Sequence, residues 1–150
     1  MRRAVELARE GMERQDGGPF GCVIARGDEI VGEGSNRVTS TNDPTAHAEV
    51  VAIRDACSRL GTFQLAGCTV YTSCEPCPMC FGAIYWARPD AIYFAGTRED
   101  AAEAGFDDEH FYRQLELPNA ERELPLQPLL RDEAKAVFRS WIEKPDKTEY

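Results

Sequence analysis

Apolar residues recur along the chain at two spacings, one typical of helices and one typical of strands. Near the start, Val5, Leu7, Ala8 and Met12 fall on one face of a helix among charged neighbours. The run Gly17-Gly18-Pro19 then ends that helix, because glycine and proline interrupt helical structure.

Runs rich in β-branched and aromatic residues predict four strands. Residues 20–25 and 29–34 flank Gly27-Asp28, a turn sequence that makes the pair a hairpin. Residues 67–73 and 91–95 are the third and fourth strands. The polar stretch 35–44 between the second strand and the next helix predicts a loop.

Helices alternate with these strands. One helix carries His47 and Glu49 and continues through Cys57, one runs through residues 81–88, and one covers residues 133–142. The alternation predicts an α/β fold, a three-layer α/β/α sandwich around a central mixed sheet, in a single domain over residues 1–150.

Between the fourth strand and the last helix the pattern is weaker. Residues 97–105 are acidic and rich in alanine, and Phe106-Asp107-Asp108 breaks that stretch. Residues 118–128 contain several prolines, which favours irregular structure or an edge strand at most. Residues 143–150 form a polar tail.

Composition argues for a small substrate. The 150 residues carry a net charge of −9, whereas binding a phosphate backbone requires clustered lysine and arginine. No apolar run approaches the ~20 residues of a membrane span, and the first ten residues lack the apolar core of a secretory signal. The six cysteines are therefore expected to be reduced, in a cytoplasmic protein that binds neither nucleic acid nor membrane.

The strongest chemical signal joins His47 and Glu49 to the later run 74–80, which contains Cys77 and Cys80. One imidazole and two thiolates supply three of the four ligands of a tetrahedral Zn²⁺, which leaves a fourth position for water or hydroxide. Cys77 and Cys80 are one helical turn apart, and Pro76 suits the start of their helix. The order H-x-E and then P-C-x-x-C is a signature of zinc nucleobase deaminases.

Glu49 is the predicted catalytic residue. A glutamate near a helix start is ordinarily a capping or solvated residue, but two positions after a metal ligand it can move protons at the bound water. The alternatives are a structural zinc site with Cys74 as fourth ligand, or a redox pair of cysteines; catalytic zinc is favoured over both.

Five stretches of the sequence match a known family, and they are residues 17–21, 42–50, 71–88, 100–108 and 147–150. On these stretches almost the whole chain resembles the bacterial guanine deaminases of the cytidine-deaminase superfamily. The metal motifs are shared with tRNA adenosine deaminases, whereas residues 100–108 and the terminal tyrosine are more specific to the guanine-acting family.

The resemblance implies hydrolytic deamination of guanine to xanthine and ammonia in purine catabolism, with one zinc per subunit. It also implies a homodimer whose subunits exchange their C-terminal segments, so that Asp108 and Tyr150 arrive from the exchanged segment. The substrate-binding residues that it implies are Asn36, the backbone at Ala48, Phe20, Trp86, Asp108 and Tyr150.

Three rivals remain open on the residues alone. One is a tRNA adenosine deaminase, which needs a basic surface for RNA. Another is a related enzyme that acts on guanosine, cytosine or an aminotriazine. The third is a zinc-binding scaffold without activity.

Overall fold

The computed structural model describes residues 1–106 and 108–149. The chain divides into two units, residues 1–111 and 112–150. The first unit holds every strand of the part of the chain that the structure describes, and the second holds helix α7 (Arg131–Glu143).

A four-stranded sheet in the order β2-β1-β3-β4 forms the middle of the first unit. The predicted hairpin joins β1 (Gly21–Arg26) to β2 (Glu29–Ser35), and Gly27, with φ of 59°, takes the left-handed conformation of the turn. Strand β3 (Thr69–Cys74) pairs antiparallel with β1 and parallel with β4 (Ala91–Gly96). The predicted mixed sheet is therefore confirmed.

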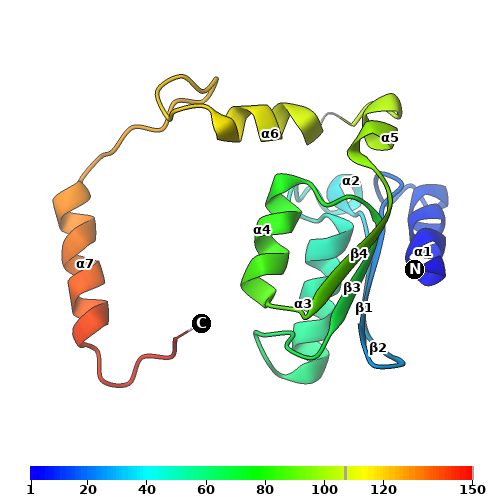
Figure 1. Ribbon diagram of the computed structural model, residues 1–150, viewed down its shortest axis with the longest axis horizontal. Coiled ribbons are helices and arrows are strands. Elements are labelled where there is room, and N and C mark those ends of the chain that lie inside the picture. The colour runs from blue at the N-terminus through cyan, green and yellow to red at the C-terminus, as the bar shows by residue number, and fades with distance from the viewer. Residues whose placement is uncertain (107, 150) are drawn as a thin grey trace. The chain divides into compact units, whose positions relative to one another are not determined.

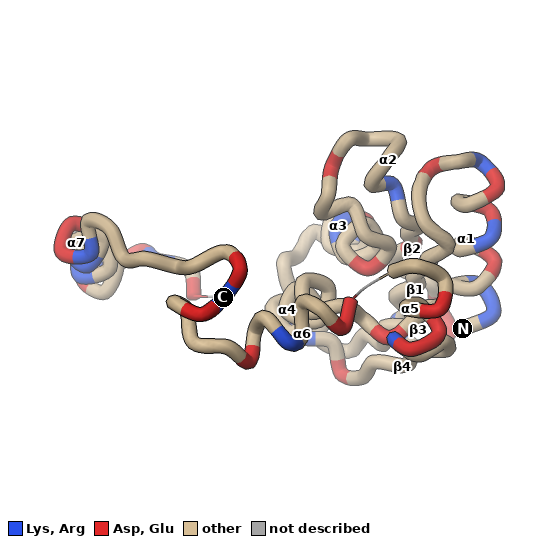
Figure 2. The backbone as a smooth tube through the Cα atoms, turned by 90° about the horizontal axis from the view of Figure 1, so that it is seen from above, with Lys and Arg blue, Asp and Glu red and all other residues tan. Residues whose placement is uncertain are grey.

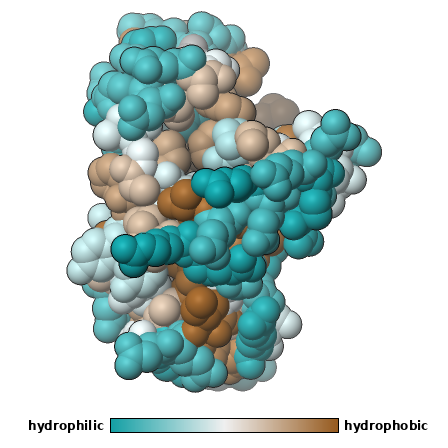
Figure 3. Space-filling view, turned by 90° about the vertical axis from the view of Figure 1, so that its right-hand side faces the viewer, coloured by the Kyte–Doolittle hydropathy of each residue, from teal (hydrophilic) through white to brown (hydrophobic). Residues whose placement is uncertain are grey.

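Helices cover both faces of this sheet (Figure 1). Helix α1 (Arg2–Glu13) packs on one face through Ala4 and Leu7, which contact Val23 of β1. Helices α3 (Ala48–Leu60) and α4 (Pro78–Ala87) lie on the other face, over the larger apolar core. The face that carries α1 is hydrophilic over most of its area, with apolar side chains in smaller patches (Figure 3). The three-layer prediction is confirmed.

Helix α3 packs unusually close to β2 because glycines face it. A Cβ atom on Gly34 would lie 2.4 Å from the carbonyl oxygen of Ala48, and one on Gly32 would lie 2.7 Å from that of Ala52. Small residues on the helix, including Ala48 and Ala56, complete the contact. This contact sets the position of the first turn of α3, which carries Glu49.

Three short helices depart from the predictions. The expected loop 35–44 contains α2 (Val38–Thr41), and the acidic stretch after β4 forms α5 (Arg98–Glu103). A capping box between Thr97 and Asp100 starts α5. Helix α6 (Asp108–Glu116) follows the predicted break. Residues 118–128 contain neither helix nor strand, as predicted.

The second unit presents apolar side chains to solvent. Helix α7 begins two residues before the predicted start and ends one residue after the predicted end. Its Val137, Phe138 and Ile142 are each more than two-thirds exposed. Among the described residues, no helix is both long and apolar enough to span a membrane.

Candidate metal and substrate site

Two helix starts on the same face of the sheet bring the predicted metal ligands together. His47 is the N-cap residue of α3, and Cys77 is the N-cap residue of α4, with Pro78 in its first turn. The sequence predicted that Pro76 would lie at the start of this helix. The helix begins two residues later, at Pro78, where the missing N–H of proline costs nothing. Neither cap side chain makes a capping hydrogen bond, so both are available as ligands.

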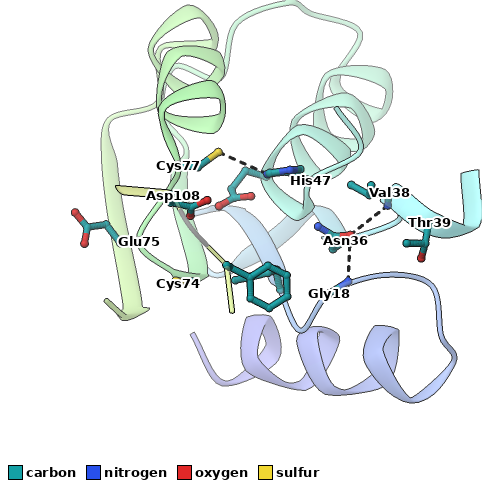
Figure 4. A pocket seen from close by; sticks show the side chains of 12 residues that line it. Gly18, Asn36, Val38, Thr39, His47, Cys74, Glu75, Cys77 and Asp108 are labelled. Atoms are coloured by element: carbon teal, nitrogen blue, oxygen red, sulfur yellow. Dashed lines mark hydrogen bonds between the residues drawn. The ribbon is translucent and has the colours of Figure 1, made fainter. Parts of the chain in front are cut away.

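The donor atoms are spaced as zinc requires. The Nδ1 atom of His47 lies 3.6 Å from Sγ of Cys77 (Figure 4). The same atom lies 3.5 Å from Sγ of Cys80. Tetrahedral bonds of ~2.3 Å to sulfur and ~2.0 Å to nitrogen place such atoms about 3.6 Å apart. The three residues therefore fit Zn²⁺, and they are the metal-binding group found among the described residues.

Cys74, the alternative fourth ligand, is outside that group. Its thiol instead donates a hydrogen bond to the carbonyl oxygen of Thr97, at 3.4 Å. Burial raises the pKa of this thiol to about 11, and the charge of Asp108 adds to the effect. A closed structural site of three cysteines and a histidine is therefore not what the chain forms.

The pKa values of the two ligand cysteines shift in opposite directions. A hydrogen bond from Cys80 lowers the pKa of Cys77, and the same bond raises the pKa of Cys80. The positive end of the α4 dipole also favours thiolates at these two positions. A hydrogen bond with Cys77 raises the pKa of His47.

Glu49 lies in the first turn of α3, two residues from His47, and is only 6% exposed. Burial raises the pKa of its carboxyl group above the ordinary value, because charge is disfavoured away from water. The hydroxyl of Thr72 donates a hydrogen bond of 3.0 Å to its Oε1 atom. A buried carboxyl group of this kind, at the edge of a metal site, is suited to accepting and returning protons.

A cavity of about 270 Å³ opens over the metal ligands. It brings five of the other predicted site residues together with Glu49 and also includes Phe106, which was not predicted as a site residue. The lining includes Phe20, Asn36, His47, Cys77, Phe106 and Asp108.

The orientation of the Asn36 side chain follows from its hydrogen bonds. Its Oδ1 atom accepts the N–H groups of Gly18 and Val38, at 3.3 and 3.1 Å (Figure 4). The amide oxygen is thereby occupied, so the NH₂ group is what Asn36 can offer to a ligand in the cavity. If Asn36 contacts a substrate as predicted, it does so as a hydrogen-bond donor.

Aromatic and acidic residues complete the cavity from a segment after β4. Phe106 packs edge-to-face against Phe20, with ring centroids 4.8 Å apart. Asp108 lines the cavity as well. The capped helix α5 and the contact of Phe106 return the chain to the cavity. The exchange of C-terminal segments between subunits stays a prediction.

Two predicted substrate residues, Trp86 and Ala48, are not among the residues that line this cavity. Trp86 is 65% exposed on α4 and does not line it, because the inward face of that helix is occupied by Cys80, Ile84 and Ala87. The Ala48 side chain is fully buried against β2 and is not among the lining residues. Tyr150 lies outside the described residues.

Comparison with known proteins identifies the class to which the fold and this site belong. Residues 1–96 match the family described as the cytidine and deoxycytidylate deaminase zinc-binding region. The chain belongs to this family of zinc-binding deaminases. A guanine deaminase of Bacillus subtilis (strain 168) is 53% identical over 150 residues, which cover 100% of this chain and 96% of that protein.

Structural similarity agrees with the sequence comparison. The X-ray structure of guanine deaminase from Bacillus subtilis matches 99% of this chain and 95% of its own, with a TM-score of 0.96. A protein crystallised with 2,6-diaminopurine is 32% identical, with a TM-score of 0.67 over 99% of this chain and 82% of its own. The predicted resemblance to bacterial guanine deaminases is confirmed.

A tRNA-specific adenosine deaminase from Agrobacterium fabrum is also similar, but over less of the chain. It is 38% identical over 107 residues, which are 70% of this chain and 70% of that protein.

Proposed function

We propose that the protein is a guanine deaminase, which hydrolyses guanine to xanthine and ammonia. The observation that carries this proposal is the cavity itself, where a His-Cys-Cys cluster and a buried glutamate adjoin a fixed amide donor and an aspartate. The full-length similarity to a guanine deaminase supports the choice of base.

Zinc would be held by His47, Cys77 and Cys80, with water as its fourth ligand. When bound, the metal lowers the pKa of that water to about 7 and so supplies the nucleophile at neutral pH. Loading of zinc would require both cysteines as thiolates, so the Cys80 thiol, whose pKa is raised, must lose its proton.

Glu49 would move the protons of the reaction. Its carboxylate accepts a proton from the attacking water and donates it to a ring nitrogen beside C2. It then accepts the proton of the new C2 hydroxyl group and donates it to the amino group, which leaves as ammonia. Burial supports both directions of transfer, because a carboxyl group whose pKa is raised gains and loses a proton closer to neutral pH. One water enters and one ammonia leaves, so the reaction balances.

Guanine fits the polarity of the cavity. Its O6 and N7 atoms accept hydrogen bonds, which the Asn36 amide can donate, and its N1–H and exocyclic amine donate, which the Asp108 carboxylate can accept. Phe20 and Phe106 offer an apolar wall for the ring. The Ala48 backbone remains a proposed contact to the base.

The C-terminal unit is proposed to complete the site of a second copy, in a homodimer with exchanged segments. Exposed apolar side chains on α7 support this proposal, because such side chains usually mark an interface. Trp86 and Tyr150 would then meet the base in the assembled dimer. Deleting Tyr150 tests the arrangement: normal guanine turnover by the shortened chain would exclude the tail from the site.

A substrate panel with an ammonia readout tests the function on zinc-loaded protein. We expect turnover of guanine in preference to guanosine, adenine, cytosine and an aminotriazine. No signal from guanine, with turnover of another base, would overturn the assignment. The variant Glu49→Ala should retain zinc and lose turnover, which separates an enzyme from a zinc-binding scaffold.

The charge distribution supports a small substrate rather than tRNA. Acidic residues, among them Glu99 and Asp100, lie on α5, and α1 carries charges of both signs (Figure 2). A tight, salt-sensitive complex with tRNA would favour the adenosine deaminase alternative instead. We place the reaction in cytoplasmic purine breakdown, an assignment that the six unpaired cysteines support.

A further inference from the structure

A polar side chain interrupts the apolar face of the central strand β3. Val70, Thr72 and Cys74 point to the face covered by α3 and α4, and all three are buried. Thr72 is only 1% exposed, at a position where valine or isoleucine would pack equally well in a strand. Its hydroxyl therefore requires an explanation other than packing.

Among the described residues, the Thr72 hydroxyl has one hydrogen-bond partner, which is Glu49, the proposed proton carrier. It donates to Oε1 of Glu49 over 3.0 Å, between the sheet and α3, in fully buried surroundings. The position of the hydroxyl is rigid, because Thr72 pairs with Cys22 on one side and with Phe94 on the other. Threonine also has a restricted χ1 angle.

The bond from Thr72 engages one oxygen of the Glu49 carboxylate, Oε1. It therefore restricts rotation of the carboxylate and leaves the second oxygen for proton transfer.

From this geometry we propose that Thr72 is a positioning residue for deamination, which fixes the orientation of the Glu49 carboxylate at the metal site. The proposal rests on the proposed function and adds to it a residue that does not line the cavity. Thr72 acts on proton transfer through Glu49, so it affects the chemical step more than the binding of guanine.

The test compares Thr72→Val, which keeps the shape of the side chain and removes its hydroxyl, with Thr72→Ser, which restores a hydroxyl. Thr69→Val is the matched control, because it makes the same change on the same strand at a half-buried position away from the cavity. We expect kcat for guanine to fall about tenfold or more in Thr72→Val, with KM changed by less than about twofold. Thr72→Ser should recover most of the loss, and Thr69→Val should match the wild type.

Zinc content, melting temperature and a crystal structure of each variant provide readouts that do not depend on turnover. We expect Thr72→Val to keep its zinc and its fold, and to show the Glu49 carboxylate rotated from its wild-type orientation. An unchanged kcat, an unchanged carboxylate, or a parallel loss of zinc and fold would overturn the positioning role. A wild-type protein that leaves guanine untouched would instead overturn the proposed function, while the carboxylate orientation would still decide the role of Thr72.

Discussion

Replacing Gly34 by alanine should damage catalysis from outside the cavity. Gly34 lies on β2 and does not line the site, yet its backbone faces the first turn of α3. An added Cβ would lie 2.4 Å from the carbonyl oxygen of Ala48 and 2.6 Å from the backbone nitrogen of Ala52. Both neighbours are backbone atoms, so no side chain can rotate away.

The size of the effect follows from these distances. Ordinary contact begins at 3.4 Å, so the helix start must move by about 1 Å. Overpacking of this kind costs about 1–3 kcal/mol of the free energy of unfolding. For a chain of this size we expect the melting temperature to fall by about 2–4 °C for each kcal/mol. Because His47 and Glu49 move with the helix, kcat should fall about 100-fold, the effect typical of a 1 Å misplacement.

Gly82→Ala is the matched control. It makes the same substitution within α4, the other ligand-bearing helix, where an added Cβ meets nothing within 4 Å. Alanine within a helix is more favourable than glycine by up to ~1 kcal/mol, so this variant should melt slightly higher and keep wild-type turnover. Ammonia release from guanine and thermal melting, measured on both zinc-loaded variants, complete the comparison. Wild-type kcat in Gly34→Ala would refute the claim that the β2–α3 contact positions the site.

Three further predictions concern the cavity and the thiols. Gly17→Ala would place a Cβ atom 2.2 Å from Oδ1 of Asn36 and so displace that side chain. Because one well-placed hydrogen bond to guanine is then lost, we expect the KM for guanine in initial-rate assays to rise about tenfold. An unchanged KM would contradict the donor role of Asn36. Cys74, with a pKa of about 11, should remain a thiol at pH 8. Its reaction with iodoacetamide, followed by peptide mass spectrometry, should be far slower in native than in urea-unfolded protein. Equal rates would contradict the burial of Cys74. The bond with Cys77 raises the pKa of Cys80, so zinc must displace a proton from Cys80 when it binds. Chelator competition should therefore show that the affinity for zinc rises from pH 6 to pH 8. An affinity that does not change with pH would contradict thiolate ligation.

The regular elements and the metal ligands could be predicted because each depends on local pattern. Apolar periodicity located the four strands and the helices that carry Glu49 and Cys80. The spacing and types of His47, Cys77 and Cys80 indicated a shared metal, because one histidine and two cysteines are a typical set of zinc ligands. The short α2 contains four residues, too few to show a helical period.

The missed features depend on tertiary structure instead. Phe106 reaches the cavity because the chain turns back after α5, which no local pattern specifies. Trp86 points outward because Ile84 takes the inward position of α4, and a mostly apolar helix does not reveal which of its faces is buried. Thr72 resembles any strand threonine until Glu49 is placed beside it.

The two helix starts that carry the metal ligands also affect how much of the protein is folded in a cell. His47 and Cys77 stand where serine or aspartate would ordinarily cap a helix, and neither makes a capping bond. Such a cap contributes about 0.5–2 kcal/mol, so the metal-free chain forgoes this stabilisation twice. A ligand that binds the folded chain alone stabilises it in proportion to the logarithm of its concentration. The abundance of folded enzyme in a cell would therefore follow the availability of zinc as well as the expression of the chain.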